Sequence, residues 1–490
     1  MKKNSTLIIV LLLFSVGIFF NVYYPAIHGK YFADDFGFIF IPYENNLSHV
    51  FLDKNETSYA YRPLEKLFLL TIQNNYGYDT TAIHITQMTL HFLFSVMFFM
   101  WLRKEGFSIG TSVLVFLYLL FSQAATHAVA SNDTFSQIIS TLFGYFSIFF
   151  YLQFIKSKTR SAYLYIYSLL FFAVSLLGKE NALSFFPLLV LIAINNFFKL
   201  TSICKQKLLR VFFQLVPFFV TTLFYFAIRK YLDLDAATFG EDRFNMNFGL
   251  NIPINFIQAF VLALIPFSSV DLYQSIQNKS FLFLVIGGLY ICIYTIILFV
   301  PLFNKEQRLR LVKGAILLPV SLFPVIILNH ISELYVYNML PIMAFLLAIS
   351  IETIINRNRQ ALSVLIVMFF LTGFLINSFA IRSKVNSMKI NGDMTHQMLQ
   401  EIKPYLKENP FIDTLVLINK PYDQKNEYSI FKRSGFRLFE DGEVVFNKIS
   451  ERNDLEVKIV KMNEFTCKKS SDNLYLAFDE NYHIRKYQCK

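Results

Sequence analysis

Long apolar runs, separated by short polar or basic stretches, fill the chain as far as Ala380. A helix needs about 20 apolar residues to cross the hydrocarbon core of a bilayer. The chain offers about 11 such segments, at 7–27, 84–102, 109–128, four more that end before 156, 179, 199 and 229, and then 281–303, 314–328, 335–355 and 361–380. This pattern predicts an α-helical polytopic membrane protein.

The first apolar run follows Lys2 and Lys3, as the apolar region of a secretory signal peptide would. The residues after it, Asn21 to Pro25, contain no small-x-small cleavage site, and further apolar runs follow. We therefore expect an uncleaved first span with its N-terminus in the cytoplasm.

Lys and Arg cluster in short stretches between the apolar runs, such as Arg103-Lys104 and Lys305 to Lys313. Such clusters favour the cytoplasmic side. They also account for the net charge of +11, because no basic stripe interleaved with aromatic residues indicates a nucleic-acid partner. The alternation places several loops outside a cell (plasma or inner) membrane, at about 28–82, 131–133, 179–181 and 330–337.

The segment from Ile252 to Val270 does not fit a simple crossing. It is apolar but interrupted by Pro253 and Pro266, and the strong span 281–303 follows it before a basic loop. Only one of these two segments can cross fully if that basic loop is cytoplasmic. We expect the proline-interrupted segment to be a re-entrant or interfacial helix lying against protein or water.

The tail is different in kind, and we divide the chain into a transmembrane core, 1–381, and an extracytoplasmic domain, 382–490. A helical stretch near Met394 to Lys407 precedes a strand-like run, Thr414 to Ile418, which predicts a small α/β domain. The tail also holds Cys467 and Cys489. A disulfide between them fits an oxidising compartment, and two free thiols are the open alternative.

Ionisable and aromatic polar residues gather in the predicted outer loops. Each alone has a structural interpretation, as a solvated turn, a snorkelling anchor or an interfacial belt residue. Their convergence on one side of the membrane favours a functional site, because charges near a bilayer are costly to keep. The candidates are Asp34, Asp35, Arg62, Lys66, His127, Asp133, Lys179, Glu180, His330, Glu333, Tyr335 and Tyr337.

These motifs resemble the GT-C superfamily of membrane glycosyltransferases, from about Leu7 to Ala380. The acid pair Asp34-Asp35 is similar to the first-loop acids of the protein O-mannosyltransferase and lipid A aminoarabinose transferase branch. Gly178 to Ala182 and Ser332 to Tyr337 resemble two further motifs of that branch, although Leu334 stands where Arg is usual. The run 61–64, Tyr-Arg-Pro-Leu, resembles the tetratricopeptide-containing transmembrane mannosyltransferases.

The resemblance implies transfer of a sugar from a polyprenyl-phosphate donor to a protein, lipid or glycan acceptor on the outer face, with inversion. It makes Asp34 the general base and Asp35 its support, since a positioned carboxylate can take the proton of the attacking group. Arg62, Lys66 and Lys179 would stabilise the leaving phosphate. His127, Asp133, Glu180, His330, Glu333, Tyr335 and Tyr337 would line the substrate site.

No cofactor is certain from the sequence. Some members of the superfamily use a divalent metal, so a magnesium or manganese ion is possible. Two alternatives remain open, a transporter or flippase for lipid-linked saccharides and a non-catalytic membrane-anchored assembly protein. A transporter would place its ionisable residues near the middle of the membrane. The sequence does not indicate the sugar, the acceptor, the carrier length or the oligomeric state.

Overall fold

The computed structural model describes residues 2–36, 47–52, 61–77, 79–157, 161–198, 205–234, 246–278, 281–356, 360–419, 435–439, 443–452, 454–467, 472–478 and 483–488. Its helical part consists of α1 (Lys2–Ile27), α3 (Leu47–Leu52), α4 (Pro63–Tyr76), α5 (Thr80–Lys104), α6 (Ile109–Leu120), α7 (Thr126–Ala130), α8 (Phe135–Lys156), α9 (Ala162–Gly178), α10 (Phe185–Phe198), α11 (Lys205–Tyr231), α12 (Asn251–Leu264), α13 (Ser269–Gln277), α14 (Phe281–Phe299), α15 (Lys305–Ser321), α16 (Glu333–Val336), α17 (Leu340–Ile355) and α18 (Gln360–Glu408). Short 3₁₀ helices join several of them, including η1 (Gln123–Ala125), η2 (Asn132–Thr134), η3 (Glu180–Ser184), η5 (Val300–Phe303) and η6 (Val325–Ile327).

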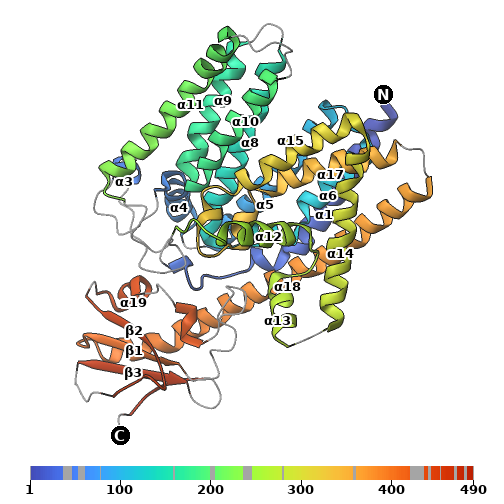
Figure 1. Ribbon diagram of the computed structural model, residues 1–490. Helices are drawn as coiled ribbons and strands as arrows, with labels where there is room; N and C mark the ends of the chain where they lie inside the picture. Colours follow the sequence, from blue (N-terminus) through green and yellow to red (C-terminus); the bar gives the residue numbers. More distant parts are fainter. Residues whose placement is uncertain are drawn as a thin grey trace.

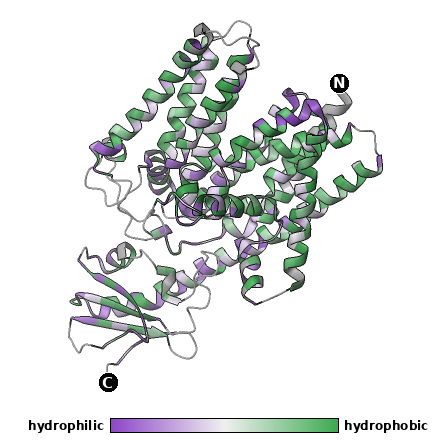
Figure 2. Ribbon diagram, in the orientation of Figure 1, coloured by the Kyte–Doolittle hydropathy of each residue, from purple (hydrophilic) through white to green (hydrophobic). Residues whose placement is uncertain are grey.

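The long helices form a membrane-type bundle. Helices α8 to α11 stand together as one group, and α1, α5, α6, α14, α15 and α17 form the other (Figure 1). Figure 2 shows these helices coloured mainly hydrophobic, with hydrophilic residues at their ends and in the C-terminal domain. The polytopic helical class predicted from the apolar runs is confirmed.

Fewer described helices are long enough to cross a membrane than there are apolar runs in the sequence. Six described helices are long and apolar enough to cross a membrane, or up to eight if two bent pairs each count as one span. Three shorter apolar helices, Ala162–Gly178, Glu180–Asn195 and Leu340–Ile355, accompany them. The count of about 11 spans therefore stays a prediction.

Two apolar runs bend within the membrane-type bundle. The run predicted at 109–128 is bent by 42° between α6 and the segment Gln123–Ala130, where the Asn377 side chain accepts a hydrogen bond from the Gln123 amide at 2.9 Å. The pair α12 and α13 is bent by 115° at a break that contains Pro266. Proline lacks the amide that would continue a helix. The sharp bend fits a broken span or a re-entrant loop.

The C-terminal domain is a small α/β unit attached through α18. Its sheet has the order β2-β1-β3-β4, formed by β1 (Thr414–Asn419), β2 (Glu456–Lys461), β3 (Asn473–Phe478) and β4 (Ile484–Lys486). Strand β1 pairs in parallel with β2 and β3, and β4 is antiparallel to β3. The 3₁₀ helix η9 (Gly435–Phe439) and helix α19 (Glu443–Ser450) complete the described domain.

Helix α18 joins the two regions without a break. It continues through residue 382, so the boundary expected between 381 and 382 falls inside a single helix of 49 residues. Its C-terminal end is fixed to the sheet, because Glu401 accepts a hydrogen bond from the Ile484 amide at 2.8 Å and Tyr405 donates to the Ile484 carbonyl at 3.2 Å. Cys467 is disulfide-bonded, and its expected partner Cys489 lies outside the described residues.

Candidate active site

The loop after α1 gives the two adjacent acids different surroundings. Asp35 is 1% exposed, and its Oδ2 accepts hydrogen bonds from the Phe32 amide at 3.0 Å and from Asn132 Nδ2 at 2.9 Å. Burial raises the pKa of Asp35 well above its ordinary range, and the neighbouring Asp133 carboxylate raises it further. Asp34 is half-buried. The structure thus gives Asp35 a fixed, internal position and leaves Asp34 the more accessible of the two.

The turn at Ser131 to Asp133 packs against this loop through the contact between Asn132 and Asp35. Ser131 donates to Asp133 Oδ1 at 2.6 Å, and Gln87 on α5 donates to the Ser131 carbonyl at 2.8 Å. His127, on α7, is half-buried and lies within electrostatic range of both Asp34 and Asp133. The structure thus brings His127 near Asp34 and Asp133, and their roles in a site stay predictions.

Arg62 and Glu180 form an ion pair. Arg62 immediately precedes α4, whose first residue is Pro63, a favourable position for proline. Its guanidinium donates to both carboxylate oxygens of Glu180, at 2.7 and 3.2 Å. Burial opposes the charge on Glu180, yet Arg62 holds the pKa of Glu180 at about 2. This bidentate contact fixes the Arg62 side chain instead of leaving it open to a ligand.

Lys179 is the buried cation next to this pair. It follows the last residue of α9, is 2% exposed, and its Nζ lies 5.9 Å from the centre of the Tyr335 ring. Burial and the Arg62 charge lower the pKa of Lys179 to about 8. In the described part of the chain, no carboxylate lies within ion-pair distance of Lys179. Lys66 is also buried, on α4 beside Glu65, which accepts a hydrogen bond from the Ser136 amide at 3.0 Å.

The segment Ser332 to Tyr337 is only partly turned toward this cluster. Glu333 is buried and pairs with Lys384 of α18 at 2.7 Å, while the Tyr337 hydroxyl contacts His91 Nδ1 at 2.8 Å. Both residues are thus engaged inside the protein, which favours a positioning role. His330 is half-buried in the loop before α16 and is not part of these contacts.

A network of buried side-chain amides, which no sequence motif indicates, includes Asn181, the residue after Glu180. Gln137 on α8 donates to Asn338 Oδ1 at 2.9 Å and accepts from Asn181 Nδ2 at 3.0 Å. Three further buried oxygens, those of the Gln87, Asn132 and Asn181 side-chain amides, have no hydrogen-bond partner among the described residues. Unpaired buried acceptors are costly, so a donor such as water or a ligand hydroxyl is expected there.

Lys384, the partner of Glu333, is a charged residue that the pattern of loops and motifs does not indicate. It follows the last predicted span, where an interfacial anchor is the ordinary interpretation of a lysine. Arg229, at the end of α11, is a second buried cation near the cluster. It lies 5.9 Å from the Tyr225 ring, which in turn packs against Tyr61 at 5.8 Å.

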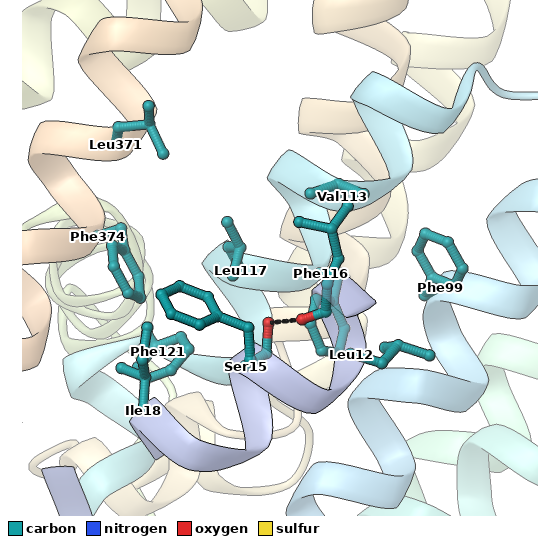
Figure 3. A pocket seen from close by; sticks show the side chains of 12 residues that line it. Leu12, Ser15, Ile18, Phe99, Val113, Phe116, Leu117, Phe121, Leu371 and Phe374 are labelled. Atoms are coloured by element: carbon teal, nitrogen blue, oxygen red, sulfur yellow. Dashed lines mark hydrogen bonds between the residues drawn. The ribbon is translucent and has the colours of Figure 1, made fainter. Parts of the chain in front are cut away.

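No metal site is formed by the residues that the structure describes, because no three of their His, Cys, Asp or Glu side chains gather around one point. The magnesium or manganese ion thus stays a prediction from the family resemblance. Figure 3 shows a separate, apolar cavity of about 180 Å³ between α1, α5, α6 and α18. Its Ser15 hydroxyl donates back to the Leu11 carbonyl at 2.8 Å, so the lining offers a hydrocarbon-like surface.

The architecture is that of a polytopic helical membrane protein with charged side chains from several loops, and the loop of Asp34 and Asp35 contacts the C-terminal domain through Ala33 and Leu438. A solved structure with this fold is ArnT from Cupriavidus metallidurans in the apo state. The two chains are 10% identical, the match covers 98% of this chain and 94% of that chain, and the TM-score is 0.53. At such low identity the likeness shows the fold alone. No family model and no curated protein matches the sequence.

Proposed function

We propose that this protein is a membrane glycosyltransferase that moves a sugar from a polyprenyl-phosphate carrier to an acceptor on the extracytoplasmic face. The observation that carries the proposal is the presence, within an ArnT-like fold, of a half-buried acid and of a buried ammonium group that has no carboxylate within ion-pair distance among the described residues. These are Asp34 and Lys179. Glycosyl transfer from a lipid phosphate needs one group of each kind, a base for the acceptor and a cation for the leaving group.

Asp34 is the proposed general base. The acceptor hydroxyl or amine loses its proton to the Asp34 carboxylate as it attacks the anomeric carbon, and the bond to the carrier phosphate breaks. A single displacement of this kind inverts the anomeric configuration. Asp35 is unsuited to the same task because Phe32 and Asn132 occupy its Oδ2 and burial favours its neutral form. We assign Asp35 to holding the loop and the Asn132 side chain.

Lys179 is the proposed contact to the leaving phosphate. Its ammonium lies in a buried, water-poor site, where a charge acts more strongly than it does in water. Arg62 is already bound by Glu180 through its Nε and Nη2 atoms, and its Nη1 lies 3.7 Å from Glu65, so we assign it to adding positive charge beside Lys179 and to ordering the start of α4. Tyr335 lies against the Lys179 ammonium and limits its directions of approach.

The unpaired amide oxygens suit a sugar. Gln87, Asn132 and Asn181 each present a buried carbonyl oxygen that accepts a hydrogen bond, and sugar hydroxyls are donors. Asp133, fixed by Ser131, adds a carboxylate to the same region. The apolar cavity in the bundle supports a lipid-linked donor, because a hydrocarbon chain can occupy it without losing polar contacts.

The test is the substitution Asp34→Asn, with mass analysis of envelope glycans in cells that carry or lack the protein. We expect the product glycan to disappear in the variant at normal expression, since an amide cannot act as the base. Asp79→Asn is the matched control, because Asp79 is an exposed acid of the same outer region that caps α5, and asparagine caps equally well. Its product should remain at the wild-type amount.

The possible results separate the competing functions. Undiminished product with Asp34→Asn would show that the general-base assignment is wrong. Identical glycans with and without the protein would refute glycosyl transfer in those cells and favour an assembly role. A transporter would give a third pattern, in which the lipid-linked donor accumulates and the substitution of Asp34 has no greater effect than that of Asp79.

A further inference from the structure

Helix α18 contacts the candidate site at two points. Lys384 pairs with Glu333, and Gly392, eight residues further on, packs against the backbone of Lys30 in the acid-bearing loop. An α-helix has about 3.6 residues per turn, so these two positions lie on one face of α18. Figure 1 shows the same helix continuing below the bundle into the C-terminal domain.

The approach of α18 to the loop requires a glycine at position 392. A Cβ atom there would lie 2.7 Å from the Lys30 nitrogen and 2.9 Å from its carbonyl carbon, and closer still to its carbonyl oxygen. Such contacts force one of the two backbones to move. A salt bridge between Lys30 and Asp393, at 3.4 Å, lies beside the contact but is exposed on both sides and therefore weak.

The C-terminal domain contacts the same loop at the acids themselves. The Ala33 amide donates to the Leu438 carbonyl at 2.7 Å, and the ring of Phe36 stacks on Phe439 at 5.9 Å. Ala33 is buried with φ = 54°, a left-handed conformation that costs an alanine about 1–2 kcal/mol. A conformation of this kind persists only where its surroundings enforce it.

The contacting segment is itself fixed to the sheet. The Phe436 amide donates to Asn419 Oδ1 at the end of β1, at 2.8 Å, and the Phe436 ring stacks on Phe478 of β3 at 4.3 Å. Phe439 also packs against Phe446 of α19 at 5.1 Å. A continuous series of contacts thus runs from the sheet through η9 to the residue before Asp34.

We infer that α18 and the C-terminal domain together position the Asp34-Asp35 loop, with Gly392 and Phe439 as positioning residues. This gives the tail a role in the reaction that goes beyond the ion pair of Lys384 with Glu333. The inference goes beyond the proposed function. Of the measurements that test it, only that of the product glycan rests on the proposed function.

The experiment compares Gly392→Ala with Gly373→Ala, in the purified protein for hydrogen exchange and phosphate binding and in cells for the product glycan. Both changes replace a helical glycine of α18, and alanine favours a helix by about 1 kcal/mol, so neither weakens the helix itself. A Cβ at position 373 would meet Tyr294 and Tyr290 at 3.5 and 3.8 Å, which are ordinary contacts. Only the change at position 392 should disturb the loop.

Hydrogen exchange followed by mass spectrometry reports the loop directly. Peptides covering residues 28–36 should exchange about tenfold faster in Gly392→Ala, while peptides from β1 keep their wild-type rate. The product glycan should also fall about tenfold, with the affinity for undecaprenyl phosphate unchanged, because a displaced base slows transfer without removing the phosphate contact. Gly373→Ala should match the wild type in all three measurements.

A second variant guards against a failure to fold. Phe439→Leu keeps an apolar side chain in the domain but removes the stack on Phe36, and it should also speed exchange in 28–36. Wild-type exchange in 28–36 for both Gly392→Ala and Phe439→Leu would overturn the inference. Faster loop exchange together with identical glycans in cells with and without the protein would instead refute the proposed function and leave the positioning of the loop intact.

Discussion

Glu333 and Lys384 form a buried ion pair whose loss should be measurable. Their side chains are 6% and 2% exposed, and both carboxylate oxygens of Glu333 lie 2.7 Å from the Lys384 ammonium. At this distance the attraction is about 6 kcal/mol with an effective dielectric constant of about 20. The pair must first be removed from water, so its net contribution is smaller. Removing one partner, however, leaves an uncompensated buried charge and costs about 3–5 kcal/mol.

The expected change in melting temperature follows from the size of the chain. Unfolding entropy of about 2.1 cal/mol/K per residue gives about 1 kcal/mol per degree for 490 residues. Lys384→Met and Glu333→Gln should therefore each lower Tm by about 3–5 °C, as measured by intrinsic fluorescence in detergent. The double variant should recover much of this loss, because neither charge is then left alone.

The control is Lys389→Met, five residues further along α18. Lys389 pairs with Asp393 at 2.5 Å, but the two side chains are 37% and 39% exposed, so the loss should be less than about 1 kcal/mol. Shifts in Tm for Lys384→Met and Glu333→Gln no larger than that of Lys389→Met would refute the reasoning, as would strictly additive losses in the double variant.

Two further predictions concern charge and sidedness. Affinity for undecaprenyl phosphate should fall as pH rises through about 8, because the Lys179 ammonium is charged below its lowered pKa and neutral above it. Lys179→Arg should abolish this decline, since arginine keeps its charge over the same pH range. A decline in the Lys179→Arg variant equal to that of the wild type would contradict the assignment of Lys179 to the phosphate. A cysteine at the exposed Glu408 should react with an impermeant maleimide in intact cells, whereas one at the exposed Arg308 should not. Labelling of the cysteine at position 308 but not of the one at position 408 would show that the chain is oriented in the membrane opposite to our proposal.

The apolar pattern predicts the helices better than it predicts their continuity. The run at 109–128 carries no proline or charge at its break, so nothing in its hydropathy announces the bend after Leu120. In the tail the sequence pattern predicts a helix end where the structure has none. Arg382 and Lys384 indicate the end of the apolar span, but a change from apolar to polar residues does not end a helix, and α18 continues to Glu408, just before Asn409-Pro410.

The site was predictable as a gathering of loops but not as a set of contacts. Loop charge alone predicts that the acid pair, Arg62 and Lys179 lie on one side of the membrane. The partners of Glu333 and Tyr337, by contrast, are Lys384 and His91, which are 51 and 246 residues away in the chain. A motif identifies residue types and their order, and only the packed structure shows which of them already have partners.

The different surroundings of Asp34 and Asp35 explain how two acids can stand next to each other in the sequence at a buried site. Two ionised carboxylates in adjacent positions repel each other, and burial makes that repulsion stronger. The left-handed turn at Ala33 directs Asp35 inward to Asn132, and burial then favours the neutral form of Asp35. Asp34 can therefore act as a base beside a neighbour with little charge. The Ala33 amide in this turn donates to the Leu438 carbonyl, so the chemistry proposed for the membrane region depends on a residue of the C-terminal domain.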